Sequence, residues 1–136
     1  MIIQKEHDIK SILMKQLLAL KIGGSVITDK AVAYKAKKQA IRRIVKALKQ
    51  SSLPILLSHG VGSFAHTSAK KYGGKNGYTD TWGIAKVAFD AQAINAIVME
   101  ILLEEGLPAV SFSPRSFFLS KQGEESKHFF QPIEEV

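Results

Sequence analysis

Two glycine-rich segments contain the residues that could do chemistry. The first reads Lys21-Ile-Gly-Gly-Ser-Val-Ile-Thr-Asp-Lys30, and the second reads His59-Gly-Val-Gly-Ser-Phe-Ala-His66. Each follows a short apolar run that is typical of a buried strand, and its glycines let backbone N–H groups turn toward one anion. One segment is flanked by lysines and the other is closed by a histidine. Together they predict phosphoryl transfer between a donor and an acceptor, each bound by its own segment.

The charged side chains of these segments have predicted roles. Lys21 ends an apolar strand, where burying an ammonium is costly unless it meets an anion or a cleft. Lys30 lies far enough along the chain for the loop between them to bring its ammonium back to the same site. Lysine binds phosphate as a compact charge that can follow the oxygen atoms. His66 can donate a hydrogen bond to a phosphate oxygen. For His59 we expect a structural role, with its ring bonded to the backbone.

The second segment also predicts an anion site at the start of a helix. Gly60 and Gly62 permit a close approach of the backbone to an anion. Ser63 is placed to cap the helix that follows, and the N-terminus of that helix adds partial positive charge.

The remaining pattern predicts how these segments are positioned. We predict strands at 17–22, 54–58 and 109–112, and helices at 35–49, 63–72 and about 81–105. Strands separated by helices imply an α/β fold with a parallel sheet, whose ligands bind outside the carboxyl ends of the strands. Both glycine-rich segments lie at such ends. The last of these helices is apolar over most of its circumference, so we expect it to be buried on more than one side or to line a pocket.

Length and composition narrow the possible classes. The 136 residues, with 46% hydrophobic and 23% charged residues, predict one globular domain over 17–136. Residues 1–16 precede the first strand and are interpreted as a flexible or helical extension, or as the product of a start codon placed too far upstream. No apolar run is long enough to span a bilayer, so we expect no membrane partner. Cysteine is absent, which favours a reducing cytoplasm.

The net charge of +7 raises the question of nucleic acid. Many of the cations fall within 35–49, around an apolar stripe with helical spacing at 41, 44, 45 and 48. No aromatic residues alternate with them to stack on bases. We therefore interpret the basic residues as a solvated helix face and expect no nucleic-acid partner.

Three stretches of this sequence resemble the amino acid kinase superfamily and, within it, the isopentenyl phosphate kinases of the archaeal mevalonate pathway of isoprenoid biosynthesis. They read LLALKIGGSVITDK, LLSHGVGSFAHTSAKKYG and EILLEEGLPAVSFSPRSFF. The most specific element is the histidine after Gly-Ser-Phe and a small residue. It separates isopentenyl phosphate kinases, and the similar fosfomycin kinases, from acetylglutamate and uridylate kinases. The resemblance implies a three-layer sandwich around a parallel sheet, of which this chain holds the N-terminal, acceptor-binding part.

The resemblance also implies roles for individual residues. Lys21 and Lys30 match lysines that neutralise the transferring phosphoryl group, and His66 matches the histidine that binds the acceptor phosphate. The phosphate-binding backbone matches at Gly23, Gly24 and Ser25 for the nucleotide, and at Gly60, Val61, Gly62 and Ser63 for the acceptor. The wall of the pocket for the isoprenoid tail matches at Ile84, Val87, Ala88 and Ala91.

In this family the reaction converts ATP and isopentenyl phosphate into ADP and isopentenyl diphosphate with Mg²⁺, and we predict no metal ligands on this chain. The acceptor phosphate is already an anionic nucleophile, so positioning and charge neutralisation would carry the rate. The family and an exposed apolar sheet edge both favour a homodimer.

Two departures from the family pattern qualify these expectations. Val61 and Ala65 stand where glycine or another very small residue is usual. The chain also stops at Val136, before the half that supplies most of the nucleotide site, so we expect it to bind the acceptor side and to have little activity by itself. Two alternatives stay open: another small-molecule kinase of the superfamily, such as a phosphonate kinase, and a non-catalytic module that pairs with a partner chain.

Overall fold

The computed structural model describes residues 16–74, 77–78, 80–121 and 124–131. All but the last residue of the expected N-terminal extension therefore lies outside the described residues. The main elements of the α/β part are β1 (Leu18–Ile22), α2 (Gly24–Ile27), α3 (Lys38–Leu48), β2 (Ile55–His59), α4 (Gly62–Tyr72) and α5 (Thr81–Glu104). Two short strand pairs and a 3₁₀ turn complete it: β3 (Gly73–Gly74) with β4 (Gly77–Tyr78), the turn η1 (Pro114–Ser116), and β5 (Phe118–Lys121) with β6 (Glu124–His128).

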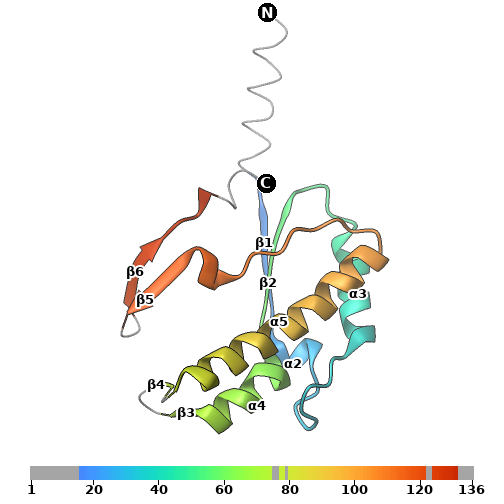
Figure 1. Ribbon diagram of the computed structural model, residues 1–136. Helices are drawn as coiled ribbons and strands as arrows, with labels where there is room; N and C mark the ends of the chain where they lie inside the picture. Colours follow the sequence, from blue (N-terminus) through green and yellow to red (C-terminus); the bar gives the residue numbers. More distant parts are fainter. Residues whose placement is uncertain (1–15, 75–76, 79, 122–123, 132–136) are drawn as a thin grey trace, which may run out of the picture.

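The two central strands are parallel, as the alternation of strands and helices predicts. Leu18 lies opposite Ile55, and Ile22 lies opposite His59. Because α3 makes the crossover between the strands, their carboxyl ends meet at one edge of the sheet. Figure 1 shows α2 and α4 beginning at this edge. The α/β fold with a parallel sheet is confirmed.

One face of the strand pair lies against the hydrophobic core. Ile22 and Leu57 pack against a buried cluster contributed by four helices: Ile27, Ile41, Val45, Phe64, Ile94, Val98, Ile101 and Leu102. Side chains alternate along a strand, and on the opposite face Ala19 and Leu56 are exposed. The core therefore lies between the sheet and the helices, directly beneath the edge at which the glycine-rich segments begin.

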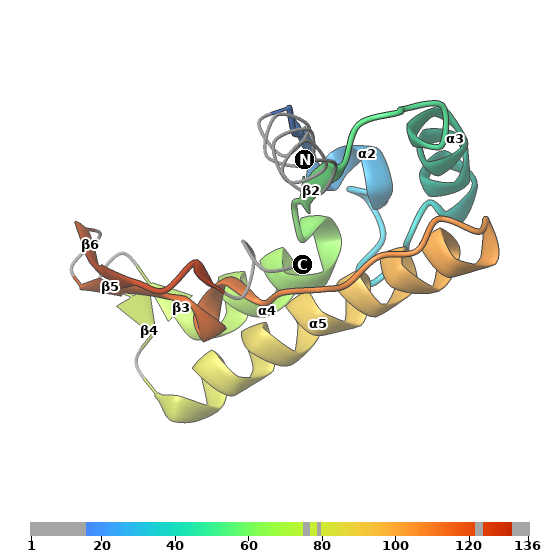
Figure 2. The same cartoon turned by 90° about the horizontal axis from the view of Figure 1, so that it is seen from above.

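The predicted strand at 109–112 is wrong. These residues form no ladder with β1 or β2, and the antiparallel pair β5–β6 follows instead. Figure 2 shows the segment running back along α5. A strand exists only where a neighbouring edge supplies hydrogen-bond partners in register, and this path does not bring the segment to one.

The helix expected at 35–49 begins three residues later. Ala36 forms an isolated bridge with Thr28, and the Lys37 N–H donates to the Ile27 carbonyl over 2.8 Å. The backbone before Lys38 is thus already paired with the end of the first segment, and cannot join the helix.

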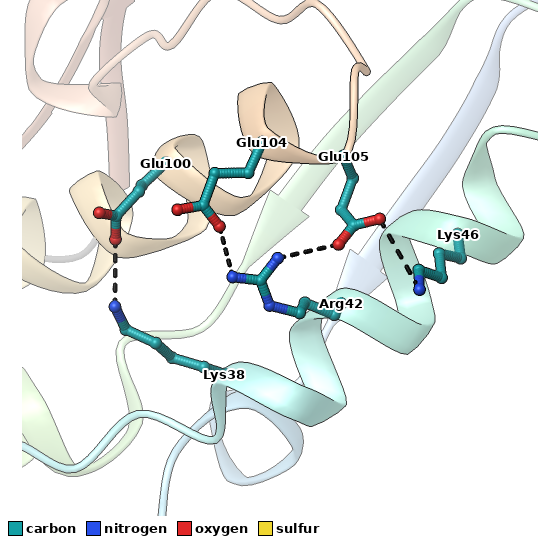
Figure 3. Close-up of polar contacts among 6 residues, drawn as sticks. All are labelled: Lys38, Arg42, Lys46, Glu100, Glu104 and Glu105. Carbon is teal, nitrogen blue, oxygen red and sulfur yellow. Dashed lines mark hydrogen bonds and ion pairs between the residues drawn. The ribbon is translucent and has the colours of Figure 1, made fainter.

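The basic face of α3 is not simply solvated, as the sequence led us to expect, because part of it pairs with α5 (Figure 3). Arg42 binds both Glu104 and Glu105, and the contact with the Glu105 carboxylate is 2.9 Å. Lys38 pairs with Glu100 at 3.2 Å. Hydrogen bonding from Arg42 lowers the pKa of Glu105. These pairs hold the two helices in register, although exposed ion pairs contribute little individually.

The long helix α5 is buried on one stripe, so the first of the two alternatives that its composition left open, burial on more than one side, is wrong. For the second alternative, a pocket lining, none of its residues lines the cleft described below. Ile94, Val98 and Ile101 are buried against α3 and α4, whereas Trp82 and Phe89 are 69% and 65% exposed. Its N-terminus is capped by Asp80, which accepts from the Gly83 N–H over 2.5 Å. No helix in the described part of the chain has both the length and the apolar character that a membrane span requires.

The end of α5 follows its sequence signal. Gly106 has a φ of +69°, and the Leu107 N–H donates to the Leu102 carbonyl over 2.8 Å. The Gly106 N–H donates to Leu103. This is the Schellman arrangement, in which a left-handed glycine satisfies the last carbonyls of a helix.

Candidate anion-binding cleft

The two glycine-rich segments pack against each other, backbone to backbone. A Cβ atom at Gly24 would lie 2.4 Å from the Gly62 nitrogen, and one at Gly60 would lie 2.6 Å from the Gly24 nitrogen. Gly62 has a φ of +50°. These three glycines are therefore required by the close approach of the two segments, whatever they bind.

A buried threonine joins the segments. Thr28 is completely buried; its hydroxyl donates to the Gly24 carbonyl over 2.8 Å and accepts from the Ser63 N–H over 3.0 Å. The Gly60 N–H also donates to the Ile22 carbonyl over 2.8 Å. Sequence reasoning missed Thr28, since nothing local to it indicates a contact with a residue 35 positions away.

A cleft of about 540 Å³ opens where the segments meet. The first segment and the loop after it line one side with Gly24, Ser25, Thr28, Lys30 and Ala33; α4 lines the other with Gly62, Ser63, His66, Thr67 and Lys70. The structure thus brings together six residues predicted to bind phosphate or to act on it: Gly24, Ser25, Lys30, Gly62, Ser63 and His66.

Four predicted residues of the same segments do not line this cleft: Lys21, Gly23, Gly60 and Val61. Lys21 lies opposite Ser58 in the register of β1 and β2, and both residues are exposed. Strand alternation places Lys21 on the sheet face away from the core, together with Ala19. Its catalytic role stays a prediction.

The cleft carries positive charge that no ion pair among the described residues neutralises. Lys30, His66 and Lys70 are exposed, and neither ammonium forms an ion pair within the described residues. Sequence reasoning missed Lys70, although its position four residues after His66 places both on one helix face. Two free ammonium groups and an imidazole suit an anionic ligand.

The predicted capping role of Ser63 is wrong. The helix α4 begins at Gly62 with Val61 as its N-cap, and no side chain caps it. Ser63 is therefore inside the first turn, where its Oγ is buried and has no hydrogen-bond partner within the described residues. Buried polar atoms usually have partners. Ser63 lines the cleft, so a ligand that came within reach of this hydroxyl would supply the missing partner, although the Oγ itself is covered in the structure.

The ring of His59 is held outside the cleft lining, as expected for a structural residue. Its Nδ1 lies 3.2 Å from the Gly60 carbonyl, the predicted backbone contact, and its Nε2 lies 3.1 Å from Asn95 Oδ1 on α5. Asn95 in turn donates to Ser111 over 2.8 Å. This chain of contacts ties the end of β2 to α5 and to the segment after it.

None of the residues predicted to wall a tail pocket lines the cleft. Ile84 is 48% exposed, and Val87, Ala88 and Ala91 are partly buried on α5. Their role stays a prediction. Within the described residues, there is also no group of three or more His, Cys, Asp or Glu side chains that could hold a metal ion.

Comparison with known proteins places this geometry in a family. The sequence profile of the amino acid kinase family matches residues 16–136. The isopentenyl phosphate kinase of Thermoplasma acidophilum is 36% identical over 97 residues, covering 70% of this chain and 40% of the relative. That of Methanocaldococcus jannaschii is 32% identical over 115 residues, covering 74% and 44%.

A solved structure agrees with the sequence relatives. The crystal structure of an isopentenyl phosphate kinase substrate complex matches this fold with a TM-score of 0.72 and 31% identity, over 86% of this chain and 48% of that one. The chain thus spans about half the length, or less, of the relatives it matches. On the match of its sequence and its fold, the chain belongs to the amino acid kinase family.

Proposed function

We propose that this chain supplies the acceptor-phosphate site of an isopentenyl phosphate kinase. The observation that carries the proposal is the single cleft that gathers Lys30, His66 and the unpartnered Ser63 hydroxyl between the two glycine-rich segments. The names of the relatives support the choice of substrate. The chain covers 40–44% of the length of those relatives. The reaction of a whole enzyme is therefore proposed here and does not follow from the match alone.

In this proposal, the chain's own residues bind and orient the acceptor phosphate. His66 donates a hydrogen bond to a phosphate oxygen, Ser63 offers its hydroxyl, and Lys30 and Lys70 neutralise negative charge. A phosphate monoester is already anionic and needs no strong base, so positioning and electrostatics do the work. Lys21 remains proposed as a further cation near the transferred group.

The finer features of the proposal come from the family. ATP is proposed as the phosphoryl donor. The described residues offer no cluster of side chains that could hold Mg²⁺. A place in isoprenoid biosynthesis, a cytoplasmic location, a homodimer and a tail pocket on α5 stay predictions.

Calorimetric titration with isopentenyl phosphate tests the proposal, with isopentenol as the ligand that lacks the phosphate. We expect His66→Ala to weaken the binding of isopentenyl phosphate by about 1.5–3 kcal/mol, because it removes a hydrogen bond to a charged group. The matched control is His128→Ala. The His128 ring, at the end of β6, stacks on the Phe130 ring and does not line the cleft. Equal affinity for isopentenol, or unchanged affinity after His66→Ala, would overturn the proposal. Tighter binding of a phosphonate such as fosfomycin would favour the phosphonate-kinase alternative.

A further inference from the structure

A surface loop, residues 29–37, carries Lys30 and Ala33 to the cleft. Its base is closed by the Thr28–Ala36 bridge and by the Asp29 N–H, which donates to the Lys35 carbonyl over 2.9 Å. Residues 30–35 are all exposed. Since this part of the loop buries little apolar surface, the burial of side chains cannot by itself hold it over the cleft.

At the base of the loop, Lys37 Nζ donates to the Ser25 carbonyl over 3.1 Å. Between positions 30 and 35, the side chain of Tyr34 reaches the body of the protein. The Tyr34 hydroxyl donates to Asp90 Oδ2 on α5 over 3.1 Å, and its ring meets the Phe64 ring of α4 edge-to-face at 5.8 Å. The Tyr34 backbone has a φ of +58°. A left-handed conformation is unfavourable for a tyrosine and persists only where other contacts impose it.

The acceptor of this hydrogen bond is a buried charge. Asp90 is 2% exposed and also accepts from Lys86, whose ammonium lies 5.2 Å from the centre of the Tyr34 ring. Burial raises the pKa of the Asp90 carboxyl, but the hydrogen bonds that it accepts, first that from Lys86, lower the pKa by more. Asp90 is thus a carboxylate at neutral pH, and the hydrogen bond that it accepts from Tyr34 is charge-assisted.

We propose that Tyr34 is a positioning residue, whose bond to Asp90 sets the loop over the cleft so that Lys30 faces the anion beside His66. The contact links α5 to the anion site through residues 56 positions apart. Tyr34 itself does not line the cleft, so it acts through Lys30. This inference rests on the proposed function in one respect: it takes the ligand of the cleft to be a phosphate.

Hydrogen exchange of the backbone amides tests whether Tyr34 holds the loop. In Tyr34→Phe and in Asp90→Asn, we expect the hydrogen-bonded amides of the loop, those of Asp29, Ala31 and Tyr34, to exchange about tenfold faster than in the wild type, as local opening becomes easier. Tyr72→Phe, which removes a hydroxyl at the far end of α4, is the matched control and should leave the loop unchanged. Unaltered loop exchange in Tyr34→Phe would overturn the proposal.

A double-mutant cycle tests whether Tyr34 acts through Lys30. Tyr34→Phe should weaken isopentenyl phosphate binding about three- to tenfold in the wild-type background and have no further effect in a Lys30→Ala background. Equal weakening in both backgrounds would overturn the positioning role, because a merely structural effect does not depend on Lys30. If the wild-type chain binds no phosphate, the proposed function fails, and the exchange experiment alone decides whether Tyr34 holds the loop.

Discussion

Replacing Gly24 by alanine is expected to lower the free energy of unfolding by about 3 kcal/mol, whereas the same change at Gly23 should be neutral or slightly stabilising. The two glycines are adjacent in the first segment, and the family resemblance implies a phosphate-binding role for both. Their surroundings in the structure differ, so the pair separates the effect of packing from the effect of composition.

The magnitude follows from the atoms that a new methyl group would meet. At Gly24, a Cβ would lie 2.4 Å from the nitrogen and 2.7 Å from the Cα of Gly62. These are backbone atoms that cannot rotate away, so the change falls at the upper end of the usual range for overpacking, about 1–3 kcal/mol. At Gly23, φ is −62° and ψ is 141°, which alanine adopts readily, and the nearest atom is the Val26 Cγ2 at 3.9 Å. There, alanine reduces the entropy of the unfolded chain and should add about 0.4–1 kcal/mol.

Urea unfolding, followed by circular dichroism, measures both variants. With a slope of about 2 kcal/mol per molar urea, a loss of 3 kcal/mol lowers the midpoint by about 1.5 M. Gly23→Ala should keep the wild-type midpoint or exceed it slightly. Midpoints for the two variants that agree within about 0.3 M would refute the claim that the segments touch through Gly24.

Three further predictions concern stability. Thr28→Val should cost about 1–3 kcal/mol by removing a buried hydroxyl with two partners, and Thr28→Ser should recover most of this; equal urea midpoints for the two variants would contradict it. Arg42→Ala should lower the melting temperature above pH 4.5, the ordinary pKa of Glu105. Because Arg42 lowers that pKa, its contribution is lost as pH falls through the lowered value, so wild-type and variant melts should converge in acid; a constant difference between them would count against the ion pair. Gly106→Ala should cost about 1–2 kcal/mol through its left-handed φ, since its Cβ would meet nothing closer than 3.7 Å; a urea midpoint equal to wild type would show that the turn relaxes.

The elements with a strong local signal were predicted correctly from the sequence. The apolar stripe of α3, the extent of α5, and the two apolar runs before the glycines all depend on neighbours a few residues away. The strand predicted at 109–112 failed because pairing requires an edge that the segment does not reach. The exposed apolar side of α5 could not be foreseen either. The hydrophobicity of a side chain shows that burial would be favourable, but it does not show which element would cover it.

The candidate site divides in the same way. Glycine-rich segments after parallel strands indicated that both would end at one edge of the sheet, and this is where the cleft lies. The sequence could not separate Lys30, which lines the cleft, from Lys21, which does not. One signal was overlooked: Asp90 is a carboxylate within an apolar stretch of helix, and such a charge needs partners when buried.

The sequence by itself determined the order of the two central strands and of helices α3, α4 and α5, and the chemical types available at the sheet edge, because periodicity and turn preferences act over a few residues. Only the tertiary structure decided that the glycines pack on one another, that Thr28 joins the two segments, and that Tyr34 reaches Asp90. Those contacts join residues up to 56 positions apart. They depend on how the helices pack on the sheet, which no local pattern specifies.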